Sequence, residues 1–242
     1  GDVYKRQLHF AASSSFMRTN PGVSTSNVSY LTRFNDKVVF SADDGENGQE
    51  LWISDGTEAG TYMVAAAATR GDVLIKNVIP KHLESISAKL IECGVTVTEY
   101  DDSVRVSCDR RPGKCNIKTM PHPGFPTDMQ PQMTALLSIA DGTSFVSEGV
   151  WDNRFRYVEQ LTRMGASIKV EGKMAVIEGV EQLKGAPVRA DDLRAGAALI
   201  LAGLCAEGET LVDDSGGHIE RGYCGIEEKL RAVGGRIERV AL

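Results

Sequence analysis

The pattern of apolar and polar positions changes near residue 60 of this 242-residue chain. Before that point, short β-prone runs (YLTRF, KVVFSA and ELWIS) alternate with turn residues such as Asn35-Asp36 and Asp55-Gly56. Short runs separated by Asn-Asp and Asp-Gly turns are typical of β-hairpins. Residues 13–27 are rich in Ser, Thr, Asn and Gly and lack helical periodicity, which indicates a loop or a disordered segment.

From residue 61 onward the sequence contains an internal repeat. Three segments align with one another: AAAATRGDVLIKN, LLSIADGTSFVSE and AGLCAEGETLVDD. Each has a run of small residues, then a glycine (Gly71, Gly142 or Gly208), and then a β-branched run. This pattern predicts a helix followed by a strand, and we expect the three small-residue helices to be buried.

A second repeated pattern follows each of these segments: ESISAKLIECGVTVTE, RYVEQLTRMGASIKVE and GIEEKLRAVGGRIERV. Apolar residues at i, i+3 and i+4 predict an amphipathic helix that ends at Gly94, Gly165 or Gly234, and the alternating run after each glycine predicts a strand. The first two of these glycines are 71 residues apart and the last two are 69 apart. The chain is therefore predicted to be an α/β protein in which three similar units share one core.

Composition narrows the class of protein. The chain has 27 Lys and Arg against 33 Asp and Glu, and this net charge of −6 argues against a nucleic-acid-binding surface. No run approaches the roughly 18 apolar residues that a membrane span requires. The five cysteines form no C-x-x-C pair, so neither a disulfide framework nor a zinc site is indicated. We therefore expect a cytoplasmic protein with reduced thiols, and no metal, nucleic-acid or membrane partner.

The stretch E-L-W-I-S-D-G-T-E-A-G-T closes the first part of the chain. It resembles a repeat of bacterial secreted or surface proteins of the β-propeller-like kind. The resemblance covers residues 38–61, a single repeat where an array needs several. Because one hairpin cannot bury its own hydrophobic face, we expect residues 1–57 to be a foreign or poorly ordered segment. It would hold a β-hairpin remnant and pack little against residues 58–242.

Four motifs follow in order: PHPGFPTDMQPQMT at 121–134, WDNRF at 151–155, ADDLRAGAAL at 190–199 and HIERGYCGIEEKL at 218–230. They resemble the enolpyruvyl transferases, and within them the UDP-N-acetylglucosamine 1-carboxyvinyltransferase family. The resemblance covers the C-terminal half of that family only. It implies one domain of the inside-out α/β barrel type, built from three βαβαββ-like units.

The resemblance also implies a reaction. The family moves enolpyruvate from phosphoenolpyruvate to the 3′-hydroxyl of UDP-N-acetylglucosamine in peptidoglycan synthesis, and it needs no metal or organic cofactor. Its partners are these two small-molecule substrates. The family's N-terminal domain, with its catalytic cysteine and its phosphoenolpyruvate-binding lysine, is not matched here. Cys115 lies in a different context, R-P-G-K-C-N-I. We therefore expect this chain to be inactive by itself.

Asp128 is the candidate catalytic base. Thr127 or Asp128 is expected at the N-cap or first turn of the helix QPQMTALLSIA, where helix N–H groups favour negative charge. From the residues alone, a plain cap is the simpler interpretation. The resemblance implies instead that Asp128 faces the sugar and takes the proton from the 3′-hydroxyl, so that it would be both a catalytic and a substrate-binding residue.

Five further positions match the family's motifs. Arg194 and Arg221 lie near predicted helix starts, and the resemblance implies that they help to hold phosphoenolpyruvate, with Arg221 also counted as catalytic. Solvated surface charges are the alternative for both. Arg154 and Asp192 match substrate-binding positions, although a structural ion pair is an equal alternative. Val150 matches a position that contacts the nucleotide sugar, through its backbone.

Two other functions and two origins stay open. One alternative is a β-propeller-like surface or binding module, based on residues 38–61, and the other is a shikimate-type enolpyruvyl transferase. The strings F-P-T-D-M-Q and D-N-R-F count against the latter. The E-A-G-T stretch fits both resemblances, so we expect a chimera with its seam at residues 58–61, with a natural fusion as the competing view.

Overall fold

The computed structural model describes residues 6–11, 29–34, 37–43, 49–54 and 57–241. In the segments before residue 57, and at residue 241, only the course of the backbone is described. The loop expected at residues 13–27 lies outside the described residues. Within the described part, every helix is too short or too polar to cross a membrane.

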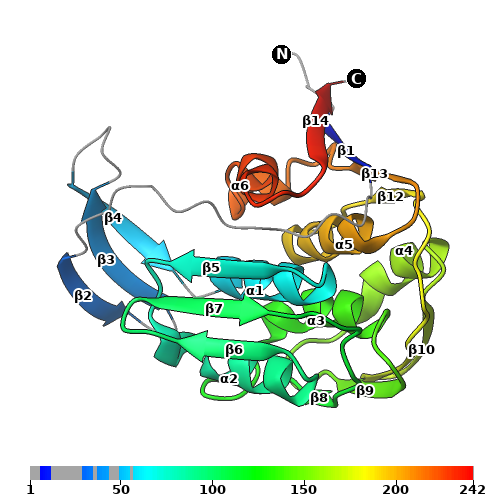
Figure 1. The fold of residues 1–242 in the computed structure, drawn as a ribbon, viewed down its shortest axis with the longest axis horizontal. Coiled ribbons are helices and arrows are strands. Elements are labelled where there is room, and N and C mark those ends of the chain that lie inside the picture. The colour runs from blue at the N-terminus through cyan, green and yellow to red at the C-terminus, as the bar shows by residue number, and fades with distance from the viewer. Residues whose placement is uncertain (1–5, 12–28, 35–36, 44–48, 55–56, 242) are drawn as a thin grey trace.

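Residues 57–241 form three similar units, each of which contributes two helices and its own strands around a shared centre (Figure 1). The first unit contains α1 (Thr57–Ala68), β5 (Asp72–Lys76), α2 (Pro80–Glu92), β6 (Thr96–Glu99) and β7 (Ser103–Ser107). The second contains β8 (Ile117–Lys118), α3 (Gln130–Leu137), β9 (Thr143–Ser147), α4 (Val158–Arg163), β10 (Ser167–Glu171) and β11 (Met174–Glu178). The third contains β12 (Pro187–Arg189), α5 (Leu193–Cys205), β13 (Glu209–Asp213), α6 (Ile226–Ala232) and β14 (Ile237–Ala241). Three short 3₁₀ turns complete the described chain: η1 (Thr127–Met129), η2 (Arg154–Tyr157) and η3 (Ile219–Arg221).

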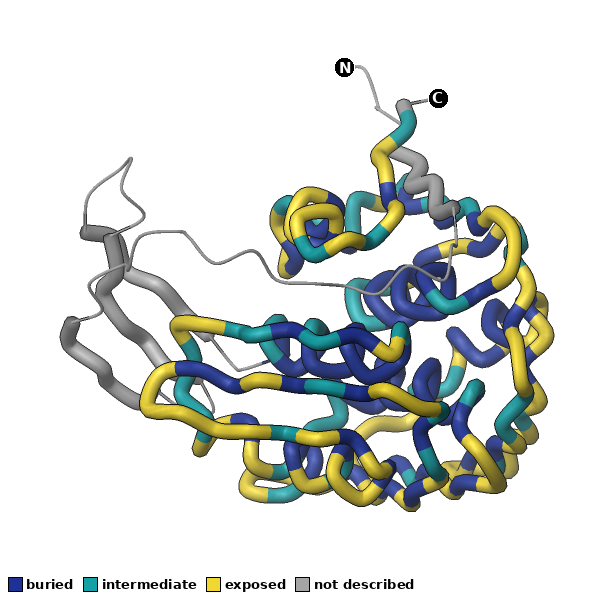
Figure 2. Tube along the Cα trace, viewed as in Figure 1, coloured by how far each residue is buried: buried dark blue, intermediate teal, exposed yellow. Residues whose placement is uncertain are grey.

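The three small-residue helices form the centre of the core, as the repeat predicted. All eight residues of α3 are buried, as are Ala65–Ala68 of α1 and Leu199–Leu204 of α5, whereas Ile139 just beyond α3 is half-buried. Figure 2 shows these helices as the dark interior of the molecule, with α2, α4 and α6 exposing one face each. Helices lined by alanine and other small residues can approach one another closely, which explains their central place.

The predicted helix ends are confirmed. Gly94, Gly165 and Gly234 all adopt positive φ angles, of 79°, 91° and 97°. At the first of them, the N–H of Gly94 donates to the Ile91 carbonyl (2.8 Å) and that of Val95 to the Leu90 carbonyl (3.0 Å). Glycine adopts this left-handed conformation without the steric penalty of a side chain, and it therefore ends helices at these positions.

The second and third units have four-stranded sheets with matching order, β8-β9-β11-β10 and β12-β13-β1-β14. The first pair in each sheet is parallel and the other pairs are antiparallel. The third sheet is completed by β1 (Arg6–Ala11), from the start of the chain, at the place that β11 holds in the second. The expectation that residues 1–57 pack little against the rest is therefore wrong for β1. Two facing strand edges, on β13 and β14, supply backbone hydrogen-bond partners for it.

The hairpins before residue 57 form a sheet of their own, β2-β3-β4 (Ser29–Phe34, Lys37–Asp43 and Gln49–Ser54). The expected pairing is present, with Phe40 opposite Trp52 in the backbone register. The prediction about the burial of the Trp52 side chain lies outside the described residues. Helix α1 begins at Thr57, so the ambiguous E-A-G-T stretch belongs to the helix.

Candidate functional site

Asp128 lies in the single 3₁₀ turn η1, between a proline-rich segment and helix α3. Pro126 restricts the backbone just before the turn, and its extended conformation (φ −71°, ψ 134°) leads directly into η1. Neither η1 nor α3 has a side-chain cap hydrogen bond at its start. The plain-cap interpretation of Asp128 is therefore wrong, and its carboxylate is directed to other partners.

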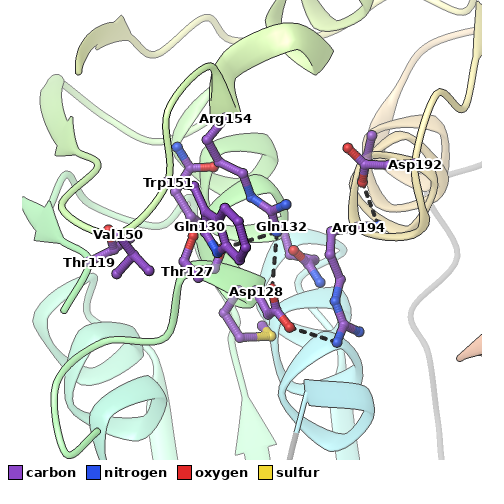
Figure 3. Close-up of polar contacts among 12 residues, drawn as sticks. Thr119, Thr127, Asp128, Gln130, Gln132, Val150, Trp151, Arg154, Asp192 and Arg194 are labelled. Atoms are coloured by element: carbon purple, nitrogen blue, oxygen red, sulfur yellow. Dashed lines mark hydrogen bonds and ion pairs between the residues drawn. The ribbon is translucent and has the colours of Figure 1, made fainter. Parts of the chain in front are cut away.

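Two guanidinium groups hold the Asp128 carboxylate, one on each oxygen (Figure 3). Arg154 Nη2 lies 3.1 Å from Oδ1, and Arg194 Nη2 lies 2.9 Å from Oδ2. The arginine side chains are 17% and 14% exposed and that of Asp128 is 39% exposed. The pairs are thus largely, but not fully, buried on the arginine side and open to solvent on the carboxylate side.

The two arginines come from different units of the fold. Arg154 is the first residue of η2 in the second unit, and it also lies 3.4 Å from the carbonyl oxygen of Thr127. Arg194 is the second residue of α5 in the third unit. Asp128 therefore links two units, and the surface-charge alternative is wrong for Arg194, whereas the ion-pair alternative holds for Arg154.

A buried polar network supports Arg194 from behind. Its Nη1 donates to the Tyr223 hydroxyl at 3.2 Å, and its guanidinium carbon lies 5.9 Å from the centre of the Tyr223 ring. The same hydroxyl pairs with Thr61 Oγ1 at 3.0 Å and accepts from Gln132 Nε2 at 3.0 Å. Thr61, Gln132 and Tyr223 are fully buried. Burial raises the pKa of the Tyr223 hydroxyl, although Arg194, Thr61 and Gln132 lower it in part, so the phenol keeps its proton.

Asp192 has a capping role in the structure. Its Oδ1 accepts the N–H groups of Arg194 and Ala195, both at 2.8 Å, at the start of α5. An aspartate at this position satisfies two of the helix's free donors and stabilises the first turn. Because Arg194 is in that turn, Asp192 fixes the point from which the Arg194 side chain extends.

Val150 and Arg221 are both exposed, but their hydrogen-bond partners differ. Val150 is 41% exposed, and its N–H donates to Glu148 Oε1 at 2.8 Å. A backbone contact between a ligand and this N–H would thus compete with Glu148. Arg221 ends η3 and is exposed, and its described hydrogen bond goes to the Gly216 carbonyl at 3.5 Å. The structure brings Asp128, Arg154 and Arg194 together, but it does not bring Arg221 into contact with them.

Four residues of this region were not predicted from the sequence: Thr61, Gln132, Glu148 and Tyr223. Tyr223 lies inside the motif HIERGYCGIEEKL, but its arginine partner is Arg194, 29 positions away, and not Arg221 of the same motif. Each of the others is a buried polar residue with at least one partner remote in the chain, such as Thr61 and Gln132, which are 71 positions apart, or Glu148 and Thr119, which are 29 apart. No local pattern encodes such contacts. In the described part of the chain, no group of three metal-ligating side chains is present.

The family of the chain follows from sequence comparison. A family model described as EPSP synthase (3-phosphoshikimate 1-carboxyvinyltransferase) matches residues 43–230. This match covers most of the chain, and the chain therefore belongs to this enolpyruvyl transferase family. The α/β fold and the family resemblance seen in the sequence are both confirmed.

Curated relatives from one branch of the family match most of this chain. It is 60% identical over 187 residues to a UDP-N-acetylglucosamine 1-carboxyvinyltransferase of Desulfofundulus thermocisternus, covering 77% of this chain and 76% of the relative. It is 56% identical over 186 residues to UDP-N-acetylglucosamine 1-carboxyvinyltransferase 3 of Symbiobacterium thermophilum, and 57% identical over 188 residues to that of Caldanaerobacter subterraneus. The matches span 44% and 45% of these last two relatives.

Solved structures share the fold. The enolpyruvyl transferase NikO of Streptomyces tendae superposes with a TM-score of 0.71 at 22% identity, covering 90% of this chain and 52% of that one. An EPSP synthase of Acinetobacter baumannii superposes with a TM-score of 0.62 at 16% identity, covering 76% of this chain and 46% of that one. At these identities the likeness concerns the fold alone.

Proposed function

We propose that this chain forms one wall of an active site that transfers enolpyruvate from phosphoenolpyruvate to the 3′-hydroxyl of UDP-N-acetylglucosamine. The observation that carries the proposal is the Asp128 carboxylate, held by Arg154 and Arg194 on two units of the fold yet open to solvent. The names of the curated relatives support the choice of acceptor. The reaction belongs to peptidoglycan synthesis.

In this proposal Asp128 is the general base. Each of its oxygens accepts one described hydrogen bond from an arginine, and a carboxylate oxygen has room for a second donor. A sugar hydroxyl within about 2.6–3.2 Å would pass its proton to Asp128. The deprotonated oxygen then bonds to the carbon of phosphoenolpyruvate that carries the phosphate, the adjacent carbon takes up a proton, and loss of phosphate and of that proton restores the double bond.

The arginines have a different role in the proposal. Arg154 and Arg194 fix the orientation of Asp128, and Arg194 also brings positive charge to the first turn of α5, where helix N–H groups favour anions. Asp192 holds that turn, and Val150 contributes to the wall beside the sugar. We keep Arg221 as a phosphoenolpyruvate contact. Because Arg221 is exposed and does not contact Asp128, that contact requires a bound substrate or further protein sequence.

We propose further that the chain alone does not turn over. It spans less than half of two of the relatives that it matches. The remaining groups of the site, such as the acid that protonates the enol carbon, would come from sequence outside the match. Absence of a positioned acid costs about 10²–10⁴-fold in rate. The proposed protein acts in the cytoplasm on small molecules, without a metal, an organic cofactor, nucleic acid or a membrane.

The test is direct. Purified chain is mixed with phosphoenolpyruvate and UDP-N-acetylglucosamine, and phosphate release and nucleotide-sugar binding are both measured. We expect binding that is weakened by Asp128→Ala, and no turnover. The matched control is Asp72→Ala, because Asp72 is 41% exposed and paired with Arg105 but lies outside the proposed site. Equal binding by wild type and Asp128→Ala would contradict the role of Asp128. Turnover by wild type that Asp128→Ala abolishes would contradict the proposed inactivity alone.

The same assay separates the alternatives. The family model takes its description from the shikimate enzyme, so shikimate 3-phosphate is the necessary competitor ligand. Binding of shikimate 3-phosphate in preference to UDP-N-acetylglucosamine would favour the shikimate-type function. We also keep two structural points as proposals: a boundary between residues 57 and 58, and an origin of the first part in a β-propeller-like protein. The separate β2-β3-β4 sheet is compatible with them, whereas the place of β1 in the third sheet is not expected for an independent segment.

A further inference from the structure

A second carboxylate lies beside the site and is not part of the proposed chemistry. Glu148 follows directly after strand β9 and is 2% exposed. Its Oε1 accepts hydrogen bonds from Thr119 Oγ1 at 2.8 Å, from Val150 N at 2.8 Å and from Trp151 N at 3.0 Å. Its Oε2 accepts one from Thr127 Oγ1 at 3.0 Å. Four donors thus converge on one buried side chain, an arrangement that restrains all of them.

These donors belong to three separate segments of the second unit. Thr119 follows β8, Thr127 begins η1, and Val150 and Trp151 form the turn after β9. The segments also approach one another closely, because the Gly149 N–H donates to Thr119 Oγ1 at 2.8 Å. A side chain at Gly149 would meet the Thr119 carbonyl oxygen at 2.5 Å, so only glycine fits this approach. Glu148 occupies the junction of the three segments.

Two of the three segments carry predicted site residues. Thr127 is joined to Asp128 by a peptide bond, and Val150 is itself bound to Glu148. Figure 3 shows Thr119, Thr127, Val150 and Trp151 gathered on one side of Asp128, with Arg154 and Arg194 reaching it from their own elements. The arginines fix the Asp128 carboxylate. Among the described hydrogen bonds, only those of Glu148 join the Val150 turn to the η1 turn through a single side chain.

We propose that Glu148 is a positioning residue, which sets the separation between Asp128 and the Val150–Trp151 turn so that both can contact one nucleotide sugar. It acts through Thr127 and through the N–H groups of Val150 and Trp151, and it does not touch the substrate. The part of the inference that concerns the sugar rests on the proposed function. The part that concerns the geometry of the two turns does not.

The chemistry of Glu148 makes its variants informative. Glu148→Ala removes all four hydrogen bonds and leaves two backbone N–H groups without this acceptor. Glu148→Gln keeps a carbonyl oxygen that can accept at the Oε1 position, and its amide can donate to Thr127 Oγ1, because a hydroxyl both donates and accepts. Glu148→Gln should therefore restore the positions of both turns, whereas a requirement for charge alone would leave it as impaired as Glu148→Ala.

The first measurement needs no ligand. In the 242-residue chain carrying Trp52→Phe, Trp151 is the only remaining tryptophan and reports on its turn by fluorescence. We expect Glu148→Ala to shift the Trp151 emission and to speed hydrogen exchange at the Val150 and Trp151 amides by about tenfold, the factor for one net hydrogen bond. Glu148→Gln should resemble wild type. The control is Glu227→Ala, since Glu227 is also buried but pairs with Arg239.

The second measurement is the affinity for UDP-N-acetylglucosamine, by calorimetry on the same proteins. We expect about tenfold or greater loss for Glu148→Ala, recovery for Glu148→Gln and no loss for Glu227→Ala. If wild type binds and Glu148→Ala binds equally well, the positioning role is wrong. If wild type does not bind, the proposed function is contradicted, and emission and exchange still decide the geometry. An unchanged Trp151 signal and unchanged amide exchange in Glu148→Ala would overturn the inference itself.

Discussion

Arg194 and Arg221 are both arginines of the third unit near helical segments, yet they lie in very different surroundings. The Arg194 side chain is 14% exposed, pairs with Asp128 and donates to the buried Tyr223 hydroxyl. Arg221 is exposed and contacts the Gly216 carbonyl at 3.5 Å. The difference arises from what lies behind each residue: three packed helices behind Arg194, and a surface turn behind Arg221. A charged side chain is held in a fixed orientation where buried residues contact it, as at Arg194. An exposed side chain such as that of Arg221 lacks this support.

The largest effect is expected for Arg194→Met. The variant keeps an unbranched side chain but leaves Asp128 with one guanidinium and the Tyr223 hydroxyl with one donor fewer. Breaking a buried ion pair costs about 3–5 kcal/mol, and we expect about 2 kcal/mol here because Asp128 can regain water. Urea denaturation measures this loss. A change below that for Arg221→Met would contradict the comparison.

A smaller loss is expected for Tyr223→Phe. The ring and its packing remain, but Gln132 Nε2, Arg194 Nη1 and Thr61 Oγ1 lose their shared partner in a buried place. We expect the free energy of unfolding to fall by about 1–2 kcal/mol. The double variant with Arg194→Met should cost less than the sum of the two single changes, because the residues are in contact. Strict additivity would show that the network does not act as a unit.

An exposed ion pair serves as a control for the variants of the buried network. Asp72 on β5 pairs with Arg105 on β7, with 2.8 Å between Arg105 Nε and Asp72 Oδ1. The hydrogen bonds from Arg105 lower the pKa of Asp72 below its ordinary value. The stabilisation is therefore present above the unfolded-state pKa, near 4 for an aspartate, and is lost as the pH falls through the lower folded-state value. Asp72→Asn should destabilise less than Tyr223→Phe at pH 7, and the difference from wild type should vanish in acid.

The smallest effect is expected for Arg221→Met without ligand. An exposed arginine with one long hydrogen bond contributes little, and we expect the free energy of unfolding to stay within about 0.5 kcal/mol of wild type. Thermal denaturation at two salt concentrations checks this. Because an exposed charge contributes little, added salt should leave the difference in Tm between the variant and wild type unchanged. A loss as large as that of Arg194→Met would mean that Arg221 has buried partners in solution.

Much of the fold was predictable because each repeated pattern consists of residues that are close together in the sequence. The glycines that end α2, α4 and α6 each follow an amphipathic helix, and their positive φ angles confirm the pattern. The burial of α1, α3 and α5 followed from their small residues. The place of β1 could not be predicted, because it depends on two strand edges more than 190 positions away in the chain.

The site was predictable only in part. Asp128, Arg194 and Arg154 were named from motifs, and the structure brings them into contact. Asp192 was named too, but its observed contacts are those of a helix cap. Glu148 was missed because its four donors come from three segments, and a lone glutamate after a strand carries no signal of that. Tertiary contacts of buried polar residues are the information that the local pattern lacks.

The most direct test of the central claim is a crystal structure of the chain with UDP-N-acetylglucosamine. The proposed function predicts that the 3′-hydroxyl lies within about 2.6–3.2 Å of an Asp128 carboxylate oxygen, with the sugar next to the Val150 turn and with Arg154 and Arg194 still flanking Asp128. A nucleotide sugar bound elsewhere on the chain, or bound here with its 3′-hydroxyl directed away from Asp128, would contradict it.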